Sequence, residues 1–139
     1  MSRSALQASS TNVQSVAVDG QIGINSIKLR FGRDLGVNNG SIVIKSCGYY
    51  SIEASVTIQP TAIGPVGVKL QYNGADIPGA VAYGYATVVD QNVTLNLSSM
   101  VRVVCNSGCP CENIPDTVSI VLTEGPGNVT SVLAESVKL

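Results

Sequence analysis

The sequence contains no histidine and no tryptophan, one phenylalanine, and few charged residues of either sign. The absence of histidine excludes Ser-His-Asp and Cys-His catalysis and every zinc site that uses an imidazole ligand. The nine carboxylates are scattered along the chain, and no two of them have a spacing that requires a shared site. We therefore expect a protein that is not an enzyme and that has neither a cofactor nor a metal site.

Basic residues and long apolar runs are also scarce. Eight Lys and Arg residues against nine Asp and Glu give a formal net charge of −1, and the one local basic cluster is Lys28, Arg30 and Arg33. Nucleic-acid binding needs a basic face, and a membrane helix needs about 18 or more apolar residues. The segment Met1 to Ser10 is too polar for a secretory signal. We expect no nucleic-acid binding, no membrane insertion, and synthesis in the cytoplasm of the host.

The low charge bears on assembly. Charged residues make up 12% of the 139-residue chain, against about 25% in a typical soluble domain. Such a chain has little charge with which to coat an isolated monomer, which favours an oligomer or a large assembly. A neutral surface rich in Ser, Thr and Asn is the alternative. The length fits a single domain.

The hydrophobic pattern is typical of β-strands. Residues 1 to 12 are small and polar without a period, so we expect a flexible N-terminal arm there and one domain over residues 13 to 139. Within that domain, Ile52, Ala54, Val56 and Ile58 alternate with polar residues. Asn39-Gly40 and Asn73-Gly74 are typical of hairpin turns. About eight to ten short strands at this spacing predict an all-β sandwich or barrel.

Two segments carry a resemblance to a known family. They are G-Y-Y-S-I-E-A-S-V (Gly48 to Val56) and L-Q-Y-N-G-A-D-I-P-G (Leu70 to Gly79). They resemble the central strands of the trimeric jelly-roll domains of the C1q and tumour-necrosis-factor (TNF) class, and in particular its short bacteriophage and bacterial members. The resemblance implies an antiparallel β-sandwich with the C1q/TNF-like jelly-roll topology, assembled as a homotrimer that binds and assembles rather than catalyses.

The resemblance also implies a place of action. No collagen-like repeat precedes the domain, and such a protein is similar to a trimeric capsid decoration or head-fibre protein on the virion surface. Its partner would be the major capsid protein or another virion protein, bound through the arm with Arg3 and Leu6 as candidate docking residues. The alternative is a receptor- or glycan-binding module of a phage fibre or bacterial surface. It would contact a host-surface glycan or protein through loops around Pro60 to Pro65 and Cys105 to Pro115.

Two tyrosines are candidates for the trimer interface. Tyr83 and Tyr85 lie two residues apart on one expected strand face of an aromatic-poor chain. Tyrosine combines a large apolar area with a hydroxyl that tolerates a partly hydrated threefold axis. The alternatives are that these side chains fill the core of their own subunit or lie at a hydrated rim.

The four cysteines leave three interpretations open. Cys47 stands alone, whereas Cys105, Cys109 and Cys111 lie together in C-N-S-G-C-P-C. They could form one or two disulfides, within a subunit or between subunits, or they could be free thiols. A four-thiolate metal site would use a spacing that is unusual for zinc.

Overall fold

The computed structural model describes residues 3–104, 116–125 and 127–139, and in these residues it contains twelve strands and no helix long and apolar enough to cross a membrane. The strands form because apolar and polar side chains alternate and because turn residues separate the runs. Their bounds are β1 (Ala5–Ser10), β2 (Gln14–Ser15), β3 (Gln21–Ile22), β4 (Ser26–Phe31), β5 (Leu35–Asn38), β6 (Ser41–Ile44), β7 (Gly48–Pro60), β8 (Gly64–Tyr72), β9 (Ala75–Ala86), β10 (Val93–Val103), β11 (Asp116–Glu124) and β12 (Gly127–Lys138).

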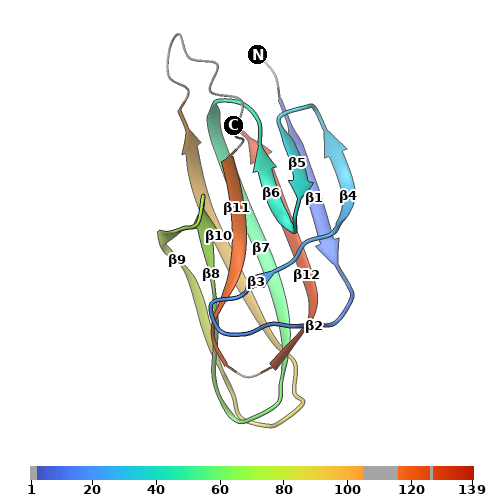
Figure 1. The fold of residues 1–139 in the computed structure, drawn as a ribbon, viewed down its shortest axis with the longest axis vertical. Helices are drawn as coiled ribbons and strands as arrows, with labels where there is room; N and C mark the ends of the chain where they lie inside the picture. The colour runs from blue at the N-terminus through green and yellow to red at the C-terminus, as the bar shows by residue number, and fades with distance from the viewer. Residues whose placement is uncertain (1–2, 105–115, 126) are drawn as a thin grey trace.

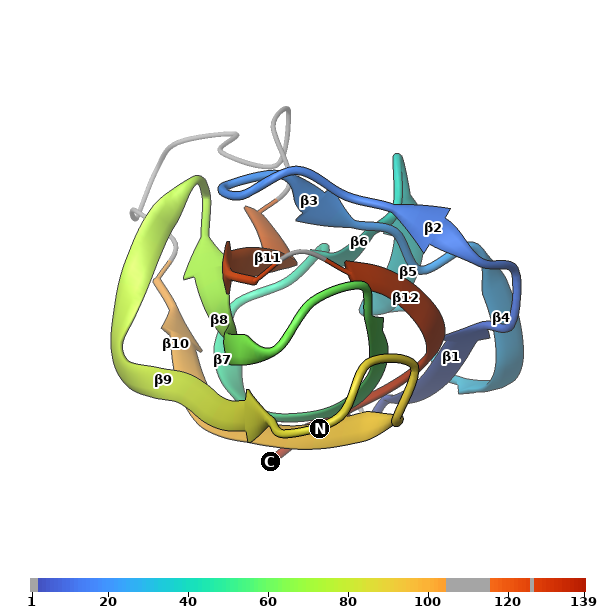
Figure 2. The same cartoon turned by 90° about the horizontal axis from the view of Figure 1, so that it is seen from below.

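The strands build two antiparallel sheets that pack face to face (Figures 1 and 2). Sheet A has the order β4-β1-β12-β7-β10, with β2 paired to β12, and sheet B has the order β5-β6-β11-β8-β9, with β3 paired to β11. Strand β9 packs against β10 on one flank of the sandwich, and β4 packs against β5 on the other. The expected antiparallel β-sandwich is confirmed.

The core lies between the sheets. Ile52, Ala54, Val56 and Ile58 of β7 are all buried there, as their alternation predicts. Burying one such aliphatic side chain contributes about 1.5–3 kcal/mol. The largest fully buried side chains come from both sheets and their connections: Tyr50, Ile22, Ile24, Leu35, Ile42, Ile44, Ile52, Ile58, Leu70, Ile120, Leu122 and Val56.

The two Asn-Gly turns have the backbone that the sequence predicts. Asn39 and Gly40 have φ of 52° and 76°, and Asn73 and Gly74 have φ of 51° and 84°. Positive φ at both central residues matches the right-handed twist of the flanking strands, and Asn and Gly adopt it at low cost. The side chain of Asn73 also accepts a hydrogen bond from the Thr117 amide at 2.8 Å, which fixes the β8–β9 hairpin to β11.

The N-terminal segment differs from the expected flexible arm. Residues Ala5–Ser10 form β1, which pairs with β12 over six residues and with β4 on its other side. Leu6 is 3% exposed and belongs to the core. The prediction of a flexible arm over residues 1 to 12 is therefore wrong for β1. Its short, small side chains hide the alternation that the neighbouring strands impose.

A polar cluster ties the two chain ends to the sandwich. The Asp34 carboxylate accepts hydrogen bonds from the hydroxyls of Ser4 at 2.5 Å and Ser46 at 2.6 Å. The Lys138 ammonium lies 3.6 Å from that carboxylate, and both side chains are 13% exposed. The Ser46 hydroxyl also lies 2.8 Å from the hydroxyl of Tyr50. The cluster thus joins β12 to the segments that flank β1, β5 and β7.

Tyr72 gives the fold an expected sensitivity to alkaline pH. Burial, and then its hydrogen bond to the Asp116 carboxylate, raise the pKa of the Tyr72 phenol above its usual value near 10. A raised pKa in the folded state means that the stabilisation is complete below pH 10 and is lost as pH rises above it. We expect the melting temperature to fall above pH 10, and to fall less in Tyr72→Phe than in the wild type. Thermal melts followed by circular dichroism at pH 8 to 12 measure this, and equal losses in both proteins would contradict it.

Candidate functional site

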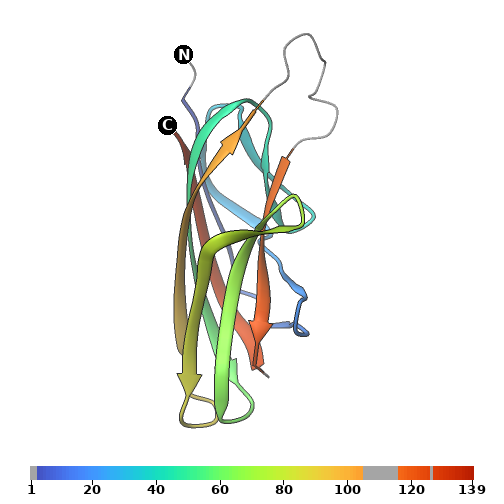
Figure 3. The ribbon, with the colours of Figure 1, turned by 90° about the vertical axis from the view of Figure 1, so that its left-hand side faces the viewer.

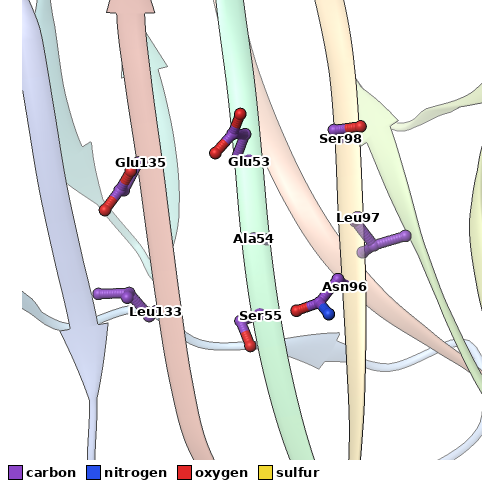
Figure 4. Close-up of a pocket in the computed structure, with 8 residues that line it drawn as sticks. All are labelled: Glu53, Ala54, Ser55, Asn96, Leu97, Ser98, Leu133 and Glu135. Atoms are coloured by element: carbon purple, nitrogen blue, oxygen red, sulfur yellow. The ribbon is translucent and has the colours of Figure 1, made fainter.

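The face of sheet A that points away from the core, here called the outer A face, carries a depression of about 310 Å³ (Figure 4). The register places Glu53 of β7 between Ser98 of β10 and Glu135 of β12, and Ser55 between Asn96 and Leu133. Its rows of side chains therefore come from three neighbouring strands. Ser55, Asn96 and Ser98 have short side chains, which leaves the surface hollow between the longer ones.

Glu53 and Glu135 lie directly opposite each other on β7 and β12. Like charges in such a cross-strand pair repel, because their Cβ atoms are about 4.5–5.5 Å apart. The Gln7 side-chain amide offsets part of this repulsion, because it donates a hydrogen bond to Glu135 at 2.8 Å. Among the described residues, no group of three or more His, Cys, Asp or Glu could hold a metal ion. The arrangement supplies two carboxylates side by side as hydrogen-bond acceptors.

Towards β4 the outer A face becomes apolar. Leu29 and Phe31 are each 67% exposed, and Val137 is 47% exposed. The register brings Phe31 beside Ala5 of β1, and Ala5 beside Val137 of β12. These side chains line a second depression of about 430 Å³. We call Ala5, Leu29, Phe31 and Val137 the β4 patch.

A second apolar surface lies on β9. Val81, Tyr83 and Tyr85 alternate along the strand and are 43%, 61% and 62% exposed. Tyr83 lies opposite Gly67 of β8, and a Cβ on Gly67 would come within 2.6 Å of the Tyr83 ring. Glycine at position 67 thus leaves the space that the Tyr83 ring occupies. We call Val81, Tyr83 and Tyr85 the β9 stripe, and its exposure contradicts the alternative that the tyrosines fill their own subunit's core.

The other predicted site residues lie in different environments. Arg3 is exposed, but Leu6 is buried, so Leu6 is not free to dock to a partner. Cys47 is disulfide-bonded, which contradicts a free thiol or a metal ligand at that position. The predictions for Cys105, Cys109 and Cys111, and for the loop from 105 to 115, lie outside the described residues.

Sequence reasoning missed the β4 patch and the Glu53–Glu135 pair. The available signal for the patch was the period of two in Ile27, Leu29 and Phe31, but that pattern is equally typical of a strand that buries one face in the core. The glutamates lie 82 positions apart in sequence. Strand pairing alone brings them together.

The comparisons with known proteins agree on the fold. No protein-family model and no curated protein matches the chain. The globular domain of zebrafish complement 1qA protein superposes with a TM-score of 0.68 and 11% identity, covering 94% of both chains. Murine APRIL at pH 8.0 gives 0.68 and 15%, covering 99% of this chain and 100% of its own. Eiger TNF from S. frugiperda gives 0.66 and 11%, covering 99% and 91%. The chain therefore has a C1q/TNF-like jelly-roll fold, as its sequence predicts.

Proposed function

We propose that this protein is a homotrimeric structural protein of a bacteriophage surface, a capsid decoration or head-fibre protein. The observation that carries the proposal is the pair of exposed apolar surfaces, the β4 patch and the β9 stripe. Exposed apolar patches of this kind mark interaction sites, particularly where charged residues are only 12% of the chain.

The positions of the two surfaces favour a ring. Strands β4 and β9 lie on opposite flanks of the sandwich (Figure 2). When two different patches on one molecule bind each other in successive copies, the contact is heterologous, and it generates a closed ring if the rotation closes. The trimeric C1q/TNF-like class suggests three copies. In this ring the β9 stripe of one subunit packs on the β4 patch of the next. The polar side chains of the depression around Glu53 and Ser55 keep water between the subunits.

In this proposal the protein does not attach to the particle through a flexible N-terminal arm, because β1 is part of sheet A. Both chain ends lie at one end of the sandwich (Figures 1 and 3), where the Lys138 amide donates a hydrogen bond to the Ser4 carbonyl at 2.9 Å. In the proposal this end faces the capsid or another virion protein, and Arg3 lies on it. The three copies in one trimer act at a high effective concentration, so weak single contacts suffice.

The trimer is tested by light scattering. We expect a native mass of three times 14.3 kDa, about 43 kDa, with or without reductant. Replacing both Tyr83 and Tyr85 with serine should shift the mass towards one chain, because both aromatic side chains leave the contact. The control is Val88→Ser, which removes an exposed apolar side chain outside both surfaces. A wild-type monomer would refute the ring. A trimer that is lost only on reduction would show instead that disulfides hold the subunits together.

The virion assignment needs a separate test. Antibodies raised against the purified trimer should label intact particles of the bacteriophage that encodes the protein. Immunogold electron microscopy measures this labelling. Pre-incubation of the antibodies with the trimer is the control and should abolish the labelling. Labelling confined to host cell surfaces would favour the receptor- or glycan-binding alternative.

A further inference from the structure

The flank that carries the β4 patch also carries a positively charged cleft with no assigned role. It has a volume of about 300 Å³ and lies between β4 and the β5–β6 hairpin, which are neighbours in Figure 1. Arg30 comes from β4, Asn38 ends β5, and Lys45 follows β6. The cleft uses two of the chain's eight basic residues, and none of its lining residues is acidic.

Neither cation of the cleft forms an ion pair with a residue that the structure describes. Within the described residues, the ion pairs join Lys69 to Asp76 and Lys138 to Asp34, and neither includes Arg30 or Lys45. Asp34 lies close to the cleft in sequence, but its carboxylate is engaged by Ser4, Ser46 and Lys138. An anion that enters the cleft therefore meets two cations without having to displace a carboxylate.

The floor of the cleft brings Lys45 close to the backbone. A Cβ on Gly36 would lie 3.5 Å from the Lys45 Nζ and 3.6 Å from its Cε, so this side chain extends over β5. Gly36 lies opposite Val43 on β6, and that valine is buried outside the main core cluster. Glycine at position 36 thus leaves open a space that any larger residue would begin to fill.

We propose that this cleft binds a small dianionic oxyanion group, namely the phosphate of a phosphorylated sugar or of a similarly small phosphomonoester. The guanidinium of Arg30 offers paired donors that match a phosphate, and the Lys45 ammonium supplies a second point charge. The Asn38 amide and the apolar side chains of Ile27 and Val37 line the rest and suit a body of the size of one sugar. A volume of about 300 Å³ is at the lower end for ligand sites. No residue of the site belongs to the β9 stripe or to the β4 patch, although Arg30 also lines the depression beside the patch, and the proposal does not depend on the trimer.

Nuclear magnetic resonance titration of the full-length protein tests the site, with glucose 6-phosphate as the probe at constant ionic strength. We expect saturable shifts of the Gly36 and Asn38 amides. Arg30→Gln and Lys45→Gln should each weaken binding by roughly tenfold or more, as expected for the loss of a charged hydrogen bond. Arg33→Gln is the matched control, because it removes the same charge from an exposed neighbour outside the cleft. That variant should keep the affinity within about twofold.

Gly36→Val gives a second variant that keeps both cations and fills the cleft. It should abolish the shifts of Asn38 while the melting temperature shows that the protein is folded.

Inorganic phosphate and glucose, titrated separately, identify the source of the affinity: binding of phosphate alone assigns the site to the free anion, and tighter binding of glucose 6-phosphate assigns it to a phosphorylated sugar. The proposal is overturned if no saturation appears up to about 50 mM, well above a millimolar Kd. Equal weakening by all three charge variants, or equal binding of glucose, also overturns it.

Discussion

Leu6→Ala is expected to lower the free energy of unfolding by about 2–5 kcal/mol, the usual cost of removing a buried leucine side chain from a core. Leu6 is 3% exposed and lies in β1, which pairs with β12 and β4. Its side chain therefore leaves a cavity between the sheets when it is shortened. Urea unfolding followed by circular dichroism measures the loss.

Arg3→Ala is the matched control for Leu6→Ala, since Arg3 is exposed and lies three positions earlier in the same segment. It should leave the unfolding midpoint unchanged. Deletion of residues 1 to 12 should be more severe than Leu6→Ala, because it removes the whole of β1 and leaves β12 and β4 without their common partner. A truncated protein that melts cooperatively at the wild-type temperature would contradict the placement of β1 and restore the flexible arm.

Asp34→Ala is expected to cost about 3–5 kcal/mol, because it removes the carboxylate that pairs with the largely buried Lys138 ammonium. The carboxylate also accepts the hydroxyls of Ser4 and Ser46, which lose their acceptor in the variant. The loss should be larger than for any exposed ion pair, since both members of this pair are 13% exposed.

A double-mutant cycle isolates the Asp34–Lys138 coupling. Combining Asp34→Ala with Lys138→Met should cost less than the sum of the two single changes, because each single change already removes the interaction between the two charges. Asp76→Ala is the control: its carboxylate pairs with Lys69 but is 61% exposed, so the melting temperature should stay near that of the wild type. Additive losses in the cycle would show that Asp34 and Lys138 do not interact in solution.

Local patterns predict much of this fold because they are decided by neighbouring residues. The alternation of Ile52, Ala54, Val56 and Ile58 requires one buried face, and the structure buries all four. The two Asn-Gly pairs predict turns because these residues tolerate positive φ, and both turns have it. Local rules failed at β1, since A-L-Q-A-S-S has small side chains whose inward direction depends on β12 and β4.

The candidate sites were less predictable, because they are made by strands that are distant in sequence. Tyr83 and Tyr85 could be singled out as rare aromatics on one strand face, but the space for the Tyr83 ring depends on Gly67 of the neighbouring strand. Lys28, Arg30 and Arg33 formed a visible cluster, yet the cleft uses Arg30 together with Lys45. No local rule joins these two residues, because β4 belongs to sheet A and Lys45 follows a strand of sheet B.

By itself the sequence determined the absence of imidazole chemistry, the low charge, the strand-forming alternation and the resemblance to C1q/TNF-like jelly rolls. These follow from composition and from interactions between close neighbours. Three relations follow from the packing of the whole chain: β1 lies inside sheet A, Glu53 faces Glu135, and Asp34 forms an ion pair with Lys138. Sheet register and packing set these relations, and both depend on contacts between residues that are far apart in the chain.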